Sequence, residues 1–311
     1  MSFSGEVKEE LSCQMSSSRH CQIAELSAIV MLCGQIIQRP SSNIFLKIQT
    51  ENLSVARKYF TLLKKTFNIE ADVLIKGNVL SSNSRGYFII IKNQSDVEKV
   101  FGALKLHEKT VSINSLITGK SCCKRAFIRG AFLASGSISD PQKFYHFEIA
   151  CNSQTQANQM KEIINSFQMD AKVVSRKKYF VVYLKEGAQI VDILNVMEAH
   201  VALMNLENLR IVKEMRNSVN RRVNCETANI NKTVSAAVKQ LEDIKYIKSH
   251  MDFSELSDPL IEIAEMRLIN PEATLLELGE MLDPPVGKSG VNHRLRKLSD
   301  LADDLSGTRE E

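Results

Sequence analysis

The chain has 311 residues, of which 44% are hydrophobic and 24% are charged. These proportions are typical of a globular protein and exclude a collagen-like or disordered chain. The length exceeds what a single hydrophobic core usually supports, so we predict two domains. No apolar run reaches the ~20 residues of a membrane helix, and the start, MSFSGEVKEEL, lacks the basic and then apolar pattern of a signal peptide. We therefore expect a cytoplasmic protein with no membrane partner.

The net charge of +4 conceals an uneven distribution of charge along the chain. Residues 1–203 carry 25 basic and 17 acidic side chains, and residues 204–250 carry 9 and 5, whereas residues 256–311 carry 6 and 12. Within this acidic end, the stretch from Gly287 to Leu298 has four basic residues and no acid. A local basic face on an acidic module predicts a polyanionic partner.

Seven cysteines are scattered along the chain without a Cys-x-x-Cys pair or a histidine at metal-ligand spacing. We therefore predict reduced, unreactive thiols, no metal site and no cofactor. The adjacent Cys122 and Cys123 leave a redox device as the alternative.

An internal repeat, at an offset of about one hundred residues, organises the first part of the chain, with copies at 22–106 and 124–198. Each copy begins with an apolar helix that ends near Gly34 or Gly136 and continues with an alternating strand, an amphipathic helix, two more strands and a closing helix. Like residues keep a constant offset, as in Phe67 and Phe167, Ala71 and Ala171, and Val73 and Val173. We predict an α+β domain over 1–203, built from a duplicated αββαββ unit.

Small residues recur one helical turn apart in the two opening helices: Ala24 and Ala28 in one, Gly130 and Ala134 in the other. Two helices with such faces can approach closely. We therefore expect these helices to meet at the centre of a pseudo-twofold domain.

The ends of these helices resemble the two motifs of the LAGLIDADG homing-endonuclease fold, LSAIVMLCG at 26–34 and IRGAFLASG at 128–136. The resemblance implies that the residue before each final glycine is an acid that holds the catalytic metal ions. Cys33 and Ser135 stand at those places, and a thiol and a hydroxyl are poor replacements for carboxylate ligands of Mg²⁺. We therefore expect no enzyme activity, with an active endonuclease as the alternative.

Basic residues also occur in or beside the predicted strands, where an open sheet could meet a polyanion. They are Lys47, Lys76, Lys92, Lys143, Arg176, Lys177 and Lys178. Solvated strand ends and turns are an equally good interpretation of these residues.

Residues 204–255 form a predicted helical connector that is broken at ETANIN, residues 226–231. Helical spacing places several of its basic residues on one face, the set being Arg210, Lys213, Arg216, Arg221 and Arg222. We favour a solvated connector over a nucleic-acid contact here.

Residues 256–311 predict three short helices. The first starts at Pro259 and ends before Asn270, and a capping box of Thr274 and Glu277 starts the second. The third runs from Gly290 to about Asp304 with Ser289 as its cap, and its predicted buried stripe is Val291, Leu295, Leu298 and Leu305. This pattern predicts an all-α helix-turn-helix domain.

The third helix carries the candidate DNA-binding residues. Asn292, His293, Arg296 and Lys297 lie opposite the apolar stripe, with Arg294 on its flank. Arginine and asparagine read guanine and adenine in the major groove, while Lys288 and Ser289 at the helix N-terminus suit phosphate. We predict double-stranded DNA as the partner. An ordinary polar face of a three-helix domain is the alternative.

Two further segments, VNRRVNCETANINKTVSAA and NPEATLLELGEMLDPPVGKSGVNHRLRKL, complete a pattern that resembles the WhiA family of bacterial transcription regulators over essentially the whole chain. The resemblance implies a sequence-specific regulator that binds promoter regions in the nucleoid and is linked to sporulation or cell division. The N-terminal domain then adds DNA contact or, alternatively, is a protein-interaction module for the transcription machinery or another regulator. The internal duplication already supplies a twofold, which is compatible with a monomer.

Overall fold

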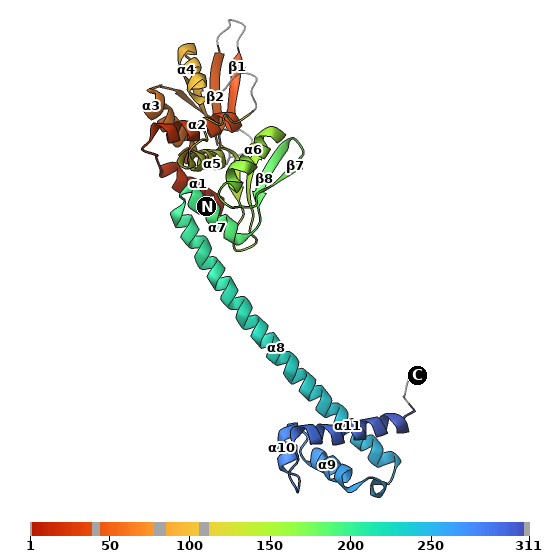
Figure 1. The fold of residues 1–311 in the computed structure, drawn as a ribbon. Helices are drawn as coiled ribbons and strands as arrows, with labels where there is room; N and C mark the ends of the chain where they lie inside the picture. Colours follow the sequence, from red (N-terminus) through yellow and green to blue (C-terminus); the bar gives the residue numbers. More distant parts are fainter. Residues whose placement is uncertain (1, 39–43, 78–84, 106–111, 308–311) are drawn as a thin grey trace. The chain divides into compact units, whose positions relative to one another are not determined.

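The computed structural model describes residues 2–38, 44–77, 85–105 and 112–307, and the chain divides into two compact units, 1–213 and 214–311 (Figure 1). The first unit opens with α1 (Phe3–Cys13), a helix that the sequence analysis did not anticipate. In the described part of the chain, no helix has the length and apolarity that crossing a membrane requires.

After α1, the first unit contains two copies of one arrangement of helices and strands. The first copy comprises α2 (Arg19–Cys33), β1 (Gly34–Gln38), β2 (Ile44–Thr50), α3 (Leu53–Phe67), β3 (Asp72–Gly77), β4 (Arg85–Ile91) and α4 (Gln94–Leu104). The second comprises α5 (Ser121–Ser135), β5 (Gly136–Ile138), β6 (Phe147–Cys151), α6 (Gln154–Asn165), β7 (Lys172–Arg176), β8 (Tyr179–Leu184) and α7 (Gly187–Met197). This order confirms the predicted duplicated αββαββ unit.

Each copy folds its four strands into an antiparallel sheet of the same topology, in the order β1-β2-β4-β3 and β5-β6-β8-β7. One face of each sheet packs on the core, because Leu46 and Ile48 of β2 are buried while Lys47 between them is not. The same alternation buries Phe147 and Ile149 of β6. On the other face, Lys47 and Phe88 of the first sheet and Glu148 and Tyr183 of the second are only partly buried.

The two opening helices, α2 and α5, pack side by side at the centre of this unit (Figure 1). A Cβ atom at Gly130 would lie 2.3 Å from the carbonyl oxygen of Glu25, so only glycine permits this approach. Ala24 and Ala28 are fully buried on the facing helix. The predicted close contact of the two helices is confirmed.

A buried ionic cluster lies at this helix pair. The Glu25 carboxylate is 3.1 Å from Lys58 Nζ and 3.3 Å from Arg129 Nε, and all three side chains are at most 2% exposed. Burial lowers the pKa of Lys58, and the charge of Glu25 opposes that shift. Arg129 also pairs with Glu198 at 2.7 Å. The buried Glu25 therefore bridges two buried cations from different copies, and Glu198 supplies the second negative charge.

The long helix α8 (His200–His250) is continuous over 51 residues, so the predicted break at residues 226–231 is wrong. The segment ETANIN consists of residues that are only moderately unfavourable in a helix, and α8 contains no proline or glycine. Polar side chains here also bond within the helix, since Thr233 Oγ1 donates to the Asn229 carbonyl at 3.0 Å.

The second unit ends with η1 (Phe253–Glu255), α9 (Asp258–Ile269), α10 (Leu275–Glu280) and α11 (Lys288–Leu305), which gives the predicted helix-turn-helix order. Val291, Leu295 and Leu298 are buried, as predicted. Two expectations are wrong. Ser289 is not the cap, because α11 already begins at Lys288, and Leu305 is 41% exposed because it is the last residue of the helix and Ala302 completes the stripe.

Candidate nucleic-acid interface

The turn between α10 and α11 determines where the last helix begins. Thr274 Oγ1 accepts a hydrogen bond from the Glu277 N–H at 3.3 Å, and the Glu277 carboxylate accepts one from the Thr274 N–H at 2.7 Å, which confirms the capping box. A Cβ atom at Gly279 would lie 2.0 Å from the Val286 carbonyl oxygen. The chain can therefore pass this closely over α10 only because residue 279 is glycine.

Two charged residues of α9 hold the neighbouring segments in place. Glu262 Oε1 accepts a hydrogen bond from the Asp283 N–H at 3.2 Å, and Glu262 Oε2 lies 3.5 Å from Arg294 Nη1. Arg267 is 2% exposed and donates to the Ala273 carbonyl at 2.6 Å. Burial lowers the pKa of Arg267. The sequence pattern indicated neither the bond of Arg267 nor the role of Glu262.

The predicted DNA-binding residues occupy two kinds of position on α11. Arg294 is half-buried against Glu262, whereas the others are exposed, namely Lys288, Ser289, Asn292, His293, Arg296 and Lys297. We call these six residues the α11 face. Within the described residues, its three cations have no ion pair with an acid. The face combines side chains that bind base edges with the open N–H groups of a helix start, which bind phosphate.

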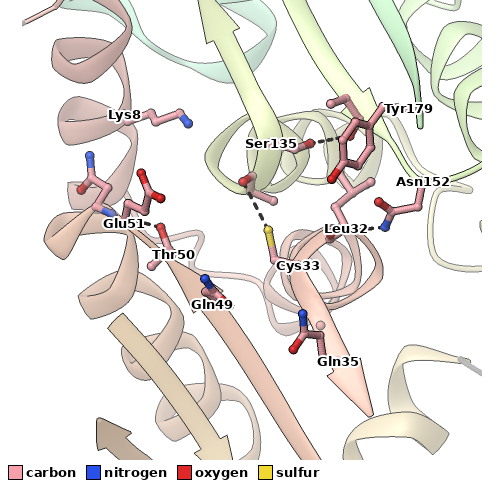
Figure 2. Close-up of a pocket in the computed structure, with 14 residues that line it drawn as sticks. Lys8, Leu32, Cys33, Gln35, Gln49, Thr50, Glu51, Ser135, Asn152 and Tyr179 are labelled. Atoms are coloured by element: carbon pink, nitrogen blue, oxygen red, sulfur yellow. Dashed lines mark hydrogen bonds between the residues drawn. The ribbon is translucent and has the colours of Figure 1, made fainter. Parts of the chain in front are cut away.

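The other predicted site lies in the first unit, where α2 and α5 end beside each other (Figure 2). Cys33 is the last residue of α2 and its Sγ donates to the Ala134 carbonyl at 3.2 Å. Ser135 is the last residue of α5 and its Oγ donates to the Ala150 carbonyl at 2.7 Å. A cavity of about 570 Å³, lined by residues of both copies, opens next to them.

The chemistry of this cavity does not suit a hard metal ion. Burial raises the pKa of the Cys33 thiol to about 11, so the thiol is neutral at pH 7. Among the lining residues the only carboxylate is the exposed Glu51, and Lys8 brings a cation into the same space. Mg²⁺ needs several hard oxygen ligands, whereas the Cys33 thiol and the Ser135 hydroxyl donate their hydrogens to carbonyl groups.

Two of the basic residues predicted along the strands form ion pairs with nearby carboxylates. Lys92 Nζ lies 2.6 Å from the Asp72 carboxylate, and Arg176 Nη1 lies 3.2 Å from that of Glu148. Lys143 is exposed before β6. A polyanion would have to displace Asp72 and Glu148 before it could form ion pairs with Lys92 and Arg176.

The remaining basic residues of the sheets lie in two places. Lys47 and Lys76 lie over the ring of Phe88 on the open face of the first sheet, at 4.4 and 5.8 Å from the ring centroid. Lys177, with a φ of 51°, and Lys178 form the exposed turn between β7 and β8. The structure thus spreads the predicted cations over both sheets and does not gather them at one site.

Comparison with protein families covers most of the chain. Residues 19–107 match the WhiA N-terminal LAGLIDADG-like domain, residues 124–216 match the WhiA LAGLIDADG-like domain, and residues 219–302 match the WhiA C-terminal HTH domain. The first two matches coincide with the two copies of the repeat.

Relatives match over almost the full length. A "Probable cell division protein WhiA" from Lachnoclostridium phytofermentans is 55% identical over 98% of this chain and 99% of the relative. A protein of the same description from Clostridium botulinum is 44% identical over 98% and 99%. The crystal structure of full-length DUF199/WhiA from Thermatoga maritima shares the fold, with a TM-score of 0.61 at 22% identity over 98% of this chain and 99% of that one.

Proposed function

The chain belongs to the WhiA family, and we propose that it is a sequence-specific DNA-binding transcription regulator in which α11 reads the DNA. The observation that carries this proposal is the α11 face, whose cations have no acidic partner in the described part of the chain although the sequence has twelve acids in residues 256–311. Repulsion from those acids would direct this one face towards the phosphates.

The side chains of the α11 face divide into two roles. Arg296 binds guanine and Asn292 binds adenine, each through two hydrogen bonds, and His293 adds a donor or acceptor. Lys288, Ser289 and Lys297 bind phosphates, which position the helix without reading sequence. Arg294 contributes indirectly, because its ion pair with Glu262 sets the orientation of α11.

Selection from a random duplex library with the full-length chain tests this proposal. We expect enrichment of a defined sequence, and we expect Arg296→Ala to abolish the preference at one base-pair position. Enrichment without any shared sequence would leave only non-specific binding and would contradict the proposal. The names of the relatives point to genes of cell division as those whose promoters are controlled, and the family resemblance adds sporulation genes.

We propose that the LAGLIDADG-like unit has lost nuclease activity, because a neutral thiol and a hydroxyl replace the metal-binding acids. Supercoiled plasmid incubated with the protein and Mg²⁺ or Mn²⁺ should remain intact. Specific cleavage that disappears in a Cys33→Ala or Ser135→Ala variant would contradict this.

A protein-interaction role for the first unit is the second candidate. Val73, Leu74 and Ile75 of β3 are 48%, 48% and 62% exposed, an unusual apolar run on a surface strand. Combined with the neutralised Lys92 and Arg176, this favours a protein partner, such as the transcription machinery or another regulator. In this scheme residues 1–203 form the interaction domain, 204–255 the connector and 256–311 the DNA-binding domain.

A further inference from the structure

A group of sulfur and nitrogen atoms lies at the beginnings of α2 and α5, away from the helix ends that carry Cys33 and Ser135. His20 and Cys21 are the second and third residues of α2, and Cys122 and Cys123 are the second and third residues of α5. One ligand atom from each of the four residues lies within 4.8 Å of every other. The group therefore has the same pseudo-twofold symmetry as the fold, because each copy contributes one pair of adjacent residues.

The distances within this group fit a tetrahedral metal site. His20 Nδ1 lies 3.2 Å from Cys123 Sγ and 3.3 Å from Cys21 Sγ. Zinc bound at about 2.0–2.3 Å from tetrahedral nitrogen and sulfur ligands holds them about 3.3–3.8 Å apart. The two nitrogen–sulfur separations lie at or just below the short end of this range, and no two of the four ligand atoms are more than 4.8 Å apart. Small side-chain rotations are therefore enough to place the four atoms around an ion.

The accessibility of the four side chains also fits an ion that enters from solvent and is then enclosed. Cys21 and Cys123 are 6% and 4% exposed, whereas His20 and Cys122 are exposed. The buried pair supplies a dry inner side, and the exposed pair leaves an entry path.

We propose that His20, Cys21, Cys122 and Cys123 form a structural Zn²⁺ site that clamps the beginnings of the two central helices. Three thiolates and one imidazole nitrogen fill all four positions, so no position is left open for substrate and the role is structural rather than catalytic. Binding releases a proton from each thiol, and the occupied site carries one net negative charge. The helix N-termini at the site favour that charge.

A disulfide among the same cysteines is the competing interpretation. A disulfide would join two of the three sulfur atoms and leave the third thiol and the imidazole unbound, whereas a zinc ion binds all four groups. The convergence of His20 Nδ1 on two sulfur atoms from different helices is what favours the metal.

Metal binding by the full-length chain, purified with a thiol-free reductant and stripped of metal, tests the proposal. Co²⁺ is the spectroscopic probe, because tetrahedral thiolate coordination gives intense visible bands, and Zn²⁺ affinity follows from competition with a chromophoric chelator. We expect one Co²⁺ per chain, displaced by one Zn²⁺, with proton release on binding.

Cys122→Ser and Cys225→Ser are the matched variants, because both cysteines are exposed and only the first lies in the group. Loss of an outer-shell partner costs about 10–100-fold in metal affinity, so loss of the Cys122 ligand should cost at least about 100-fold. Cys225→Ser should bind as the unaltered chain does. Zinc should raise the melting temperature of the unaltered chain but not that of Cys122→Ser.

Two results would overturn the proposal. One is equal Zn²⁺ affinity of Cys122→Ser and the unaltered chain. The other is an intact mass two hydrogens lower, with a disulfide mapped to these cysteines and no stoichiometric Co²⁺ binding after reduction. Either would leave this group a set of thiols without a metal.

Discussion

The two units of the molecule use their basic residues in different ways. In the first, Lys58 and Arg129 are buried against Glu25, and pairs such as Arg176 with Glu148 neutralise the open sheet. In the second, the cations of the α11 face meet no acid within the described residues. Net charge alone would have assigned DNA binding to the first unit, whereas the grouping of three cations on one exposed helix face favours the second, acidic unit.

Glu25→Gln should produce the largest effect, because it removes the acid paired with the buried Lys58 and leaves the buried Arg129 with only the part-exposed Glu198. We expect a loss of about 3–5 kcal/mol in the free energy of opening of the first unit. Hydrogen exchange of α2 and α5 in the full-length chain measures it, with the second unit as an internal reference.

Glu198→Gln is the control for this variant, since it removes the other acid that touches Arg129 at a side chain 42% exposed. That change should cost no more than about 1 kcal/mol. Similar losses in the free energy of opening for the two variants would mean that the buried Glu25 contributes no more to the cluster than the part-exposed Glu198.

Arg296→Ala should weaken binding to cognate DNA by about 1–3 kcal/mol and change binding to random DNA little. Arg294→Ala, two residues away, is the comparison, because Arg294 is paired with Glu262. We expect Arg294→Ala to cost less on cognate DNA. Titrations of both variants at a fixed salt concentration measure this, and equal losses on cognate and random DNA would demote Arg296 to a phosphate contact.

Thr274→Ala removes the cap of α10 and should destabilise the helix-turn-helix by about 1 kcal/mol. Hydrogen exchange of α10 and α11 reports the change. The first unit should keep its protection unchanged, and a change there would contradict the separation of the two units.

The double change Lys177→Glu and Lys178→Glu should have the smallest effect on DNA binding. We expect the salt dependence of DNA affinity to stay the same, because the α11 face makes the phosphate contacts. By comparison, the double change Lys288→Glu and Lys297→Glu should reduce the slope of log affinity against log salt concentration by about two. A reduced slope for the Lys177 and Lys178 variant would place DNA on the sheets as well.

The periodicity of the sequence predicted most of the fold. Alternation revealed the strands, and the small residues at Ala24 and Gly130 revealed the central helix contact, because both patterns are local consequences of packing. The signals for the last three helices were similarly local, since the prolines, the Thr274 cap of α10 and the apolar stripe of α11 each act within a few residues. The break at 226–231 failed because polar composition alone does not stop a helix.

Features made by distant residues were not predictable. Glu25 and Arg129 are 104 residues apart in the chain, and the His20 and Cys123 contact spans 103. No spacing rule applies to adjacent pairs that meet only after the two copies pack. The ion pair of Arg294 with Glu262 could not be predicted for the same reason, because Glu262 lies on another helix.

The most direct test of whether α11 reads the DNA sequence is genome-wide mapping of bound DNA in cells. The mapping compares the unaltered chain with an Asn292→Ala, Arg296→Ala variant present at equal level. We expect discrete bound regions that share a sequence for the unaltered chain and the loss of these regions in the variant. The same regions bound with the same strength by the variant would show that α11 does not read the DNA.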